Sequence, residues 1–266
     1  MLSIIYPIFN RTDLFAATLD SLCQQIDRTG IPFEILVIDD GSTDQLQLML
    51  GRPTLSTLPI RYVRIDVKRL DLPVFQMPSG ANNPSAAINV GLRKAKGDWI
   101  ILTSPEVRWV RPTNLVHFKE RTDRARSAPR LTDVFVADVW DDQYHMYISG
   151  GANVRPLHFL CAYSRHLLVD VLGGFEEAYM GGWAFEDLDV LKRLYRAGAE
   201  FHGVRDILGL HQQHPRPEFS PQPAEYIYAH DRNRTLWSQH EADETRVEAN
   251  VGRTFGSPDL IVEERG

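Results

Sequence analysis

The sequence predicts an α/β protein with a mixed, mostly parallel central sheet, helices on its flanks and a helical C-terminal tail. Three observations support this prediction. Short apolar runs alternate with segments of helical periodicity in the first half of the chain. The second run, FEILVI, is apolar throughout, as in a strand covered on both faces. With 266 residues and 43% hydrophobic residues, the chain is large enough to bury a substantial core.

The first half is predicted to contain four strands and two main helices. Leu2–Tyr6 is the first strand, and apolar residues at helical spacing after Thr12 predict a helix that follows it. The next strands are expected over 33–38, 60–65 and 99–103, with a helix over 85–96 before the last of them.

The second half is less regular. Residues 108–130 are predicted to be helical in part, and strands are expected over 134–139 and 144–148. A further helix around 188–195 is expected to end near Gly198, which suits a helix C-cap. A proline-rich connector then precedes a polar tail that is predicted to be helical from Ala224 to about Ala249.

Charge and cysteine content restrict the partners and the compartment. The net charge of −6 provides no general basic field, so nucleic acid is not an expected partner. Cys23 and Cys161 each lie in an apolar stretch and are expected to be buried, reduced thiols. No stretch approaches the roughly 18 apolar residues of a membrane span, and the first residues lack the basic region of a signal peptide. We therefore expect a cytoplasmic protein, with any membrane contact peripheral and at the inner face.

Two strands are followed by acidic loops. DDGSTD, residues 39–44, comes after the second strand, and Ser104-Pro105-Glu106 comes after the strand over 99–103. Open α/β sheets bind ligands outside the carboxyl ends of their strands, so both loops are expected to border one crevice. Asp39 and Asp40 could accept hydrogen bonds from a nucleobase or a ribose, or could cap a turn. The chain has neither a G-x-G-x-x-G nor a P-loop motif.

A second acidic cluster lies in GGWAFEDLD, residues 181–189. Glu186 and Asp187 open the predicted helix, whose dipole is expected to keep them ionised, and a carboxylate beside Trp183 is suited to act as a general base. They could equally be ordinary acidic residues of a first helical turn. His211 and His214, in HQQH, are spaced to face one metal ion, although core or surface histidines are the alternative.

Taken in order, these motifs resemble those of a known family. IIYPIFNR, FEILVIDDGSTD and NPSAAINVGLRKAKGDWIILTSPE look like the nucleotide-sugar-binding half of a family 2 glycosyltransferase of the GT-A (Rossmann-like) fold. GGFEEAYMGGWAFEDLDVLKRL followed by HQQH looks like the acceptor half of galactosyltransferases and chondroitin polymerases. The resemblance implies a single domain over 1–220, with a donor half over 1–107 and an acceptor half over 108–220, and a C-terminal helical extension over 221–266.

The resemblance implies roles for particular residues. On the donor side, Pro7 would line the uracil pocket, Asp40 would contact uracil with Asp39 beside it, Asn89 would belong to the helix under the diphosphate, and Ser104 would stand at the first position of the family's D-x-D motif.

On the acceptor side, Asp187 matches the catalytic base of inverting members and Glu186 a neighbour that contacts sugar. Trp183, next to Gly182, would stack on a sugar ring. His214 matches the metal-binding position of the family, with His211 one turn away.

The expected metal site departs from the family pattern. Thr103-Ser104-Pro105-Glu106 replaces D-x-D, so Glu106 is the only acid there. We predict Glu106 as the sole carboxylate ligand of Mn²⁺ or Mg²⁺, completed by a histidine and the donor diphosphate, with weaker binding than in a D-x-D enzyme.

The predicted function is an inverting transfer of a hexose or N-acetylhexosamine from a UDP-sugar to a hydroxyl of a glycan or lipid-linked glycan. One alternative is a transferase-like domain that only binds a nucleotide sugar or a glycan. The other is a sugar nucleotidylyltransferase, which would release pyrophosphate in place of UDP. The sequence does not predict the donor sugar, the acceptor or the oligomeric state.

Overall fold

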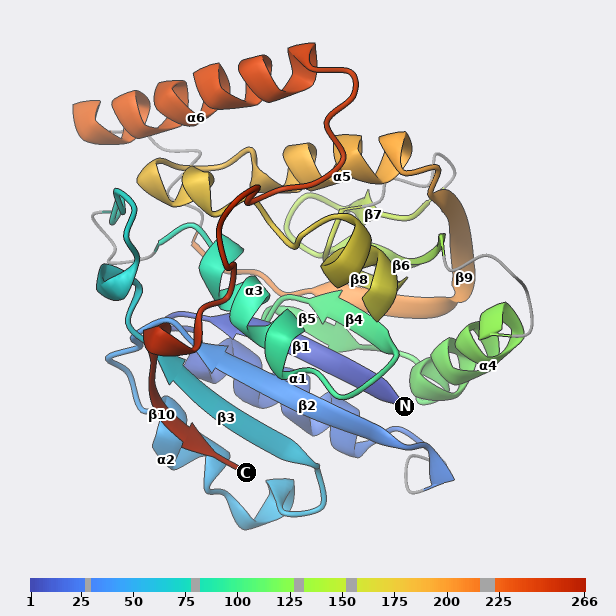
Figure 1. Ribbon diagram of the computed structural model, residues 1–266. Coiled ribbons are helices and arrows are strands. Elements are labelled where there is room, and N and C mark those ends of the chain that lie inside the picture. The colour runs from blue at the N-terminus through green and yellow to red at the C-terminus, as the bar shows by residue number, and fades with distance from the viewer. Residues whose placement is uncertain (27–29, 78–81, 127–131, 152–156, 216–222) are drawn as a thin grey trace.

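A mixed β-sheet forms the centre of the protein, seen in a computed structural model that describes residues 1–26, 30–77, 82–126, 132–151, 157–215 and 223–266 (Figure 1). Within these residues the sheet has ten strands, in the order β10-β3-β2-β1-β4-β8-β6-β9-β5, and β7 pairs with β6. The mixed, mostly parallel arrangement predicted for its N-terminal part is confirmed, since β1 pairs in parallel with both β2 and β4, and β2 with β3.

The first half follows the predicted βα order. Its elements are β1 (Leu2–Ile8), α1 (Thr12–Cys23), β2 (Phe33–Asp39), α2 (Leu46–Leu50), β3 (Ile60–Ile65), α3 (Ser85–Lys94) and β4 (Trp99–Thr103), with short 3-10 turns η2 (Pro53–Leu55) and η3 (Val67–Arg69). The parallel register pairs Ile8 with Asp39, so β1 and β2 end at the same edge of the sheet. This edge carries the polar loops that the sequence predicted there.

The second half contains more strand than the sequence predicted. Its elements are β5 (Val107–Trp109), α4 (Asn114–Arg126), β6 (Asp133–Asp141), β7 (Met146–Ser149), β8 (Leu160–Ser164), η4 (Leu167–Val171), η5 (Glu177–Gly181), α5 (Glu186–Arg196), β9 (Glu200–His211), α6 (Ala224–Ala242), η7 (Pro258–Leu260) and β10 (Ile261–Arg265). β8 joins the two halves because it pairs antiparallel with both β4 and β6.

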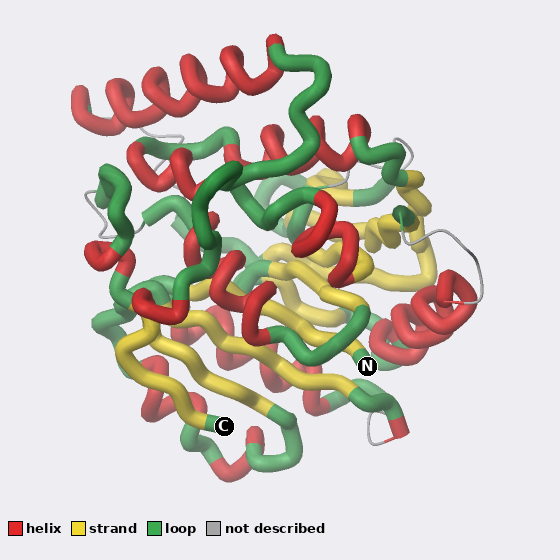
Figure 2. Tube along the Cα trace, viewed as in Figure 1, coloured by secondary structure: helices red, strands yellow, loops and turns green. Residues whose placement is uncertain are grey.

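Helices cover both faces of the sheet (Figure 2). Alternate residues of β1 point to opposite faces: Ile4 packs in the core with Phe15 of α1, and Ile5 packs in the other core with Val90 of α3. The helix α3 packs closely on β1 here, since a Cβ added at Gly91 of α3 would lie 2.6 Å from Cγ2 of Ile5. Burial on both faces explains why the central strands read as continuous apolar runs.

The C-terminal tail differs from the prediction. The helix α6 ends at Ala242 rather than near Ala249, because the Asp243 carboxylate accepts hydrogen bonds from the amide and hydroxyl of Thr245 and turns the chain out of the helix. The chain then runs past α5 and α3, and its last strand, β10, pairs antiparallel with β3 (Figure 1). The predicted boundary at 220/221 lies outside the described residues.

Two other expectations concern the whole chain. Both cysteines are free thiols, and Cys161 is buried as predicted, whereas Cys23 is half-buried rather than buried. Among the described residues, no helix is both long enough and apolar enough to cross a membrane. The cytoplasmic location stays a prediction.

Candidate active site

Three neighbouring cavities lie at the carboxyl edge of β1, β2 and β4. A cavity of about 410 Å³ lies beside Asp40, Arg64 and Asn82, and a cavity of about 540 Å³ is lined by Glu106, Trp183, His211 and His214. A smaller cavity of about 180 Å³ is lined by Glu186 and Asp187. Phe9 and Asn82 border both of the first two cavities, and Pro7 and Ser104 border both of the last two. The structure therefore places the two acidic clusters of the sequence along one continuous surface.

Asp40 lines the first cavity and has one unsatisfied acceptor atom. One carboxylate oxygen accepts a hydrogen bond of 2.9 Å from Nδ2 of Asn82, and the other is buried without a partner. Burial raises the pKa of Asp40 to about 7, and the nearby charges of Asp39 and Asp66 act in the same direction. A buried carboxylate oxygen of this kind fits an N–H donor of a ligand.

Asp39 has a supporting role in the structure. Its side chain is fully buried, and it accepts hydrogen bonds from the amide of Ser42 at 2.7 Å and the hydroxyl of Tyr62 at 2.6 Å. Arg64 approaches the same carboxylate at 3.3 Å. Asp39 therefore closes the turn and ties β2 to β3, beneath the cavity that Asp40 lines.

The second acidic cluster begins α5. Asn83 donates a 2.7 Å hydrogen bond to Glu186, and the Asp187 carboxylate accepts one of 2.8 Å from the amide of Leu188. Asn83 is itself buried and oriented by Ser85 at the start of α3. Asn82 and its neighbour Asn83 thus bridge the end of β2 to the start of α5.

Burial opposes the effect that the helix dipole was predicted to have on this pair. Burial raises the pKa of Glu186, and the charge of Asp187 raises it further. Burial also raises the pKa of Asp187, although hydrogen bonds from backbone amides oppose the shift. Desolvation therefore outweighs the favourable end of the helix. A carboxyl group with a raised pKa is a better match to a proton acceptor near neutral pH.

Asn89 lies away from the cavities. It is fully buried in α3, where its amide nitrogen donates to the carbonyl of Phe175 at 2.8 Å and to Glu177 at 2.9 Å. Its amide oxygen accepts from the Phe175 amide at 2.8 Å. These bonds hold the Gly173-Gly174 turn against α3, so Asn89 supports α3 from inside the core.

The predicted metal ligands share one cavity and already have partners. Glu106 forms a 2.8 Å ion pair with Nε of Arg11, and His211 lies 3.4 Å from the carboxylate of Asp141. The rings of His211 and His214 are 5.2 Å apart. In the part of the chain that the structure describes, the one trio of donor atoms within 4.8 Å of one another is elsewhere, on Asp133, Glu200 and His202.

The remaining predicted residues fall at or behind the same surface. The hydroxyl of Ser104 is buried between two cavities and has no hydrogen-bond partner. Trp183 lines the largest of the three cavities, and its ring lies 5.9 Å from that of Tyr226 in α6. Gly182 is buried against α6, where an added Cβ would collide with the carbonyl oxygen of Ala229.

Sequence reasoning missed several polar residues of the site. Arg11 stands in the quoted motif IIYPIFNR, but only the fold shows that it pairs with Glu106. The NNP segment before α3 offered a signal for a structural role of Asn82 and Asn83, since asparagine is a preferred residue at the start of a helix. No local signal predicts Asn233 of α6, which is fully buried beneath the segment before α5.

Solved structures define the class of this fold. The mannosyltransferase PcManGT from Pyrobaculum calidifontis, solved with GDP-Man and Mn²⁺, matches with a TM-score of 0.54 and 20% identity, over 92% of this chain and 64% of that one. Residues 1–349 of Staphylococcus aureus TarS with UDP-GlcNAc match with a TM-score of 0.62 and 17% identity, over 91% and 69%. The fold is therefore that of the GT-A glycosyltransferases.

Sequence comparison gives a family match for the N-terminal part of the chain. Residues 3–104 match the glycosyl transferase family 2 model. The hyaluronan synthase of Pasteurella multocida is 28% identical over 82% of this chain and 25% of its own length. A chondroitin synthase of Escherichia coli is 26% identical over 82% and 35%. The chain thus spans about a quarter to a third of these relatives.

Proposed function

We propose that the chain transfers a hexose or N-acetylhexosamine from a UDP-sugar to a hydroxyl of a glycan acceptor, with inversion at the anomeric carbon. The observation that carries the proposal is the unpartnered oxygen of Asp40 in one cavity and Glu186–Asp187 in a neighbouring one. A nucleobase acceptor and a proton acceptor therefore stand at two ends of a surface that would fit a nucleotide sugar. The UDP-GlcNAc complex of the TarS structure and the synthase relatives support this choice of substrates.

The donor half would hold the nucleotide. Asp40 would accept the imide N–H of uracil, and Asp39, fixed by Tyr62 and Arg64, would keep the turn in place. Pro7 and Ser104 border the path from this pocket to the start of α5. The Ser104 hydroxyl would hydrogen-bond the diphosphate or the donor sugar.

Asp187 would act as the general base. As the acceptor oxygen attacks the anomeric carbon, its proton passes to the Asp187 carboxylate, the bond between that carbon and the diphosphate oxygen breaks, and UDP leaves with the bonding electrons. Attack opposite the leaving group inverts the anomeric centre. Such base assistance contributes about 10²- to 10⁴-fold in rate. Glu186, held by Asn83, would hydrogen-bond a sugar hydroxyl, and Trp183 would stack on the acceptor sugar.

The donor set around Glu106 fits a divalent cation. A carboxylate and two imidazoles, from Glu106, His211 and His214, border one cavity, and oxygen with some nitrogen suits Mn²⁺ or Mg²⁺. When bound, such an ion would neutralise negative charge on the leaving diphosphate.

Calorimetric titration of UDP into the protein, with and without Mn²⁺, tests the donor site. We expect binding that Mn²⁺ strengthens, and we expect Glu106→Ala to remove that dependence while leaving the metal-free affinity intact. Asp170→Asn, an exposed change outside the cavities, serves as the control. No UDP binding under either condition would contradict the proposal. Product analysis with UDP-sugars then separates transfer, which releases UDP, from nucleotidyl exchange, which releases pyrophosphate.

A further inference from the structure

The segment that leads into α5 has a strained backbone. Ala184 and Phe185 have φ angles of +62° and +75°, a region that residues with a Cβ rarely adopt. Two such residues in succession stand directly before Glu186 and Asp187, and directly after Trp183. Contacts from outside the segment must hold this conformation, since its own residue types do not favour it.

The helix α6 supplies these contacts through one buried side chain. Asn233 is fully buried, and its amide nitrogen donates hydrogen bonds of 2.9 Å to the carbonyls of Tyr179 and Ala184. Its amide oxygen accepts a 2.7 Å hydrogen bond from Arg232, which also donates to the carbonyl of Ala178. Both hydrogen bonds that the Asn233 amide nitrogen donates are thus directed at the 178–184 segment, and Arg232 links the amide oxygen to the same segment.

Backbone and ring contacts reinforce this restraint. The amide of Trp183 donates a 3.2 Å hydrogen bond to the carbonyl of Ala229 in α6. Gly182 lets the two backbones approach, because a Cβ there would collide with both Ala229 and Asn233. The Phe185 ring packs at 4.9 Å and 5.9 Å from two rings of α6, those of His230 and Trp237.

We propose that Asn233 is a positioning residue of the active site, which holds 182–185 in the conformation that directs Trp183 and Asp187 to their cavities. The inference rests on the proposed function, because it assumes the roles given there to Trp183 and Asp187. It also makes α6, which belongs to the C-terminal extension, a part of the active site. Asn233 acts through backbone carbonyls and touches no substrate.

Two variants test the proposal. Asn233→Asp keeps the size of the side chain and the acceptor for Arg232, but it replaces the donor to the two carbonyls with oxygen. Asn233→Ala removes the side chain. We expect each to lower kcat at least tenfold while the Kd for UDP, measured by calorimetry, changes less than twofold, because Asp40 lies at the end of β2. Thr235→Ala, an exposed position two residues along the same helix, should change neither value.

A rescue experiment separates positioning from general stability. Glycine adopts a φ of +62° without a steric penalty, so Ala184→Gly should restore a large part of kcat in the Asn233→Asp background. An equal loss of UDP binding and kcat, or no recovery with Ala184→Gly, would overturn the proposal.

Hydrogen exchange distinguishes failure of this inference from failure of the proposed function. We expect the amides of 182–187 to exchange faster in Asn233→Asp and to slow again with Ala184→Gly. If the wild-type protein releases no UDP from a panel of UDP-hexoses and UDP-N-acetylhexosamines, the proposed function fails, yet faster exchange still supports positioning. Unchanged exchange in Asn233→Asp overturns the positioning role whatever the activity.

Discussion

Adjacent residues with the same side chain have different environments at the end of β2. Asp39 is surrounded by donors from Ser42, Tyr62 and Arg64, whereas one oxygen of Asp40 lacks any partner. The sequence pattern DDGSTD is compatible with a turn and with a ligand-binding loop, and the two aspartates differ in their contacts accordingly. The turn interpretation belongs to Asp39, and the ligand-binding one is proposed for Asp40.

The buried Asp40 carboxyl leads to a pH-dependent stability prediction. Its pKa of about 7 in the folded protein is higher than the ordinary value of an aspartate. Between about pH 4 and pH 7 the unfolded chain has therefore released this proton while the folded protein still holds it, so the stability of the wild-type protein falls as the pH rises through this range. Asp40→Asn has no proton to lose there. It should therefore gain stability over wild type through this window, by up to about 4 kcal/mol at pH 8 and little near pH 4. Urea unfolding at several pH values measures this, and a pH-independent difference would contradict it.

The role proposed for Asp187 gives a second prediction at this scale. Asp187→Asn keeps the shape of the side chain but cannot accept the proton of the acceptor hydroxyl. We expect kcat to fall by about 10²- to 10⁴-fold, with the Kd for UDP unchanged. The wild-type rate should also rise with pH at a midpoint above the ordinary pKa of an aspartate, because burial raises the pKa of Asp187. Near-normal turnover of the variant would exclude Asp187 as the base.

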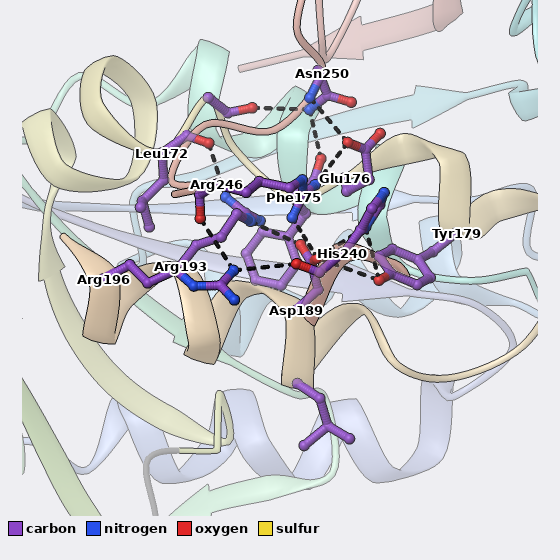
Figure 3. Close-up of polar contacts among 12 residues, drawn as sticks. Leu172, Phe175, Glu176, Tyr179, Asp189, Arg193, Arg196, His240, Arg246 and Asn250 are labelled. Atoms are coloured by element: carbon purple, nitrogen blue, oxygen red, sulfur yellow. Dashed lines mark hydrogen bonds and ion pairs between the residues drawn. The ribbon is translucent and has the colours of Figure 1, made fainter. Parts of the chain in front are cut away.

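At the scale of elements, α5 is held by a buried polar network (Figure 3). Asp189 accepts from Arg193 at 2.8 Å and from Arg246 at 2.6 Å, and it lies 3.2 Å from His240. These partners hold the pKa of Asp189 well below its usual range. Arg246 comes from the segment after α6 and also reaches Glu176 at 3.0 Å. The network therefore ties the first turn of α5 to the C-terminal part of the chain.

Arg246→Ala should destabilise the protein strongly. The substitution leaves Asp189 and Glu176 buried with one cation fewer, a change that typically costs about 3–5 kcal/mol. Arg253→Ala is the matched control, since Arg253 pairs with the same Glu176 but its side chain is 42% exposed, so its loss should cost about 1 kcal/mol or less. Chemical unfolding of both variants at pH 7 makes the comparison. Equal effects would show that the buried network does not hold α5.

At the scale of the whole molecule, the last residues belong to the central sheet. Leu260 is buried in the core between the sheet and α3, and β10 covers the outer edge of β3. The chain thus returns from α6 and α5 to the part of the sheet that the first half of the chain forms. The C-terminal residues are packed into the same core as β1, β2 and α3.

Leu260→Ala tests whether this extension unfolds together with the domain. Deleting a buried leucine side chain costs about 2–5 kcal/mol, and we expect one cooperative transition at a lower Tm. Val262→Ala, two residues along at a position that is 43% exposed, should change Tm little. Calorimetry together with near-UV circular dichroism measures both variants. A separate early transition in Leu260→Ala would show that the extension is an independent unit.

The sequence by itself determined the strands β1 to β4 and the helices α1 and α3 of the N-terminal half, because apolar periodicity and helix-start residues are local signals. It did not predict the short helix α2. It also identified the residues of the candidate site as motifs: the loops after β2 and β4, the start of α5, and the histidines at and after the end of β9. It did not predict β5, β8, β9 or β10. Neither the half-buried edge strand β10 nor LCAYS of β8 has a periodicity that separates strand from irregular chain.

Only the tertiary structure decided which of these residues face a cavity. Asp39 and Asn89 are buried supports, because partners from β3 and from the Gly173-Gly174 turn surround them. The same holds for the pKa values of Glu186 and Asp187, which burial raises against the effect of the helix dipole that the sequence suggested. Burial and pairing depend on segments distant in the sequence, since Asn233 is 49 residues from Ala184 and Arg246 is 57 residues from Asp189, and a local pattern contains no information about them.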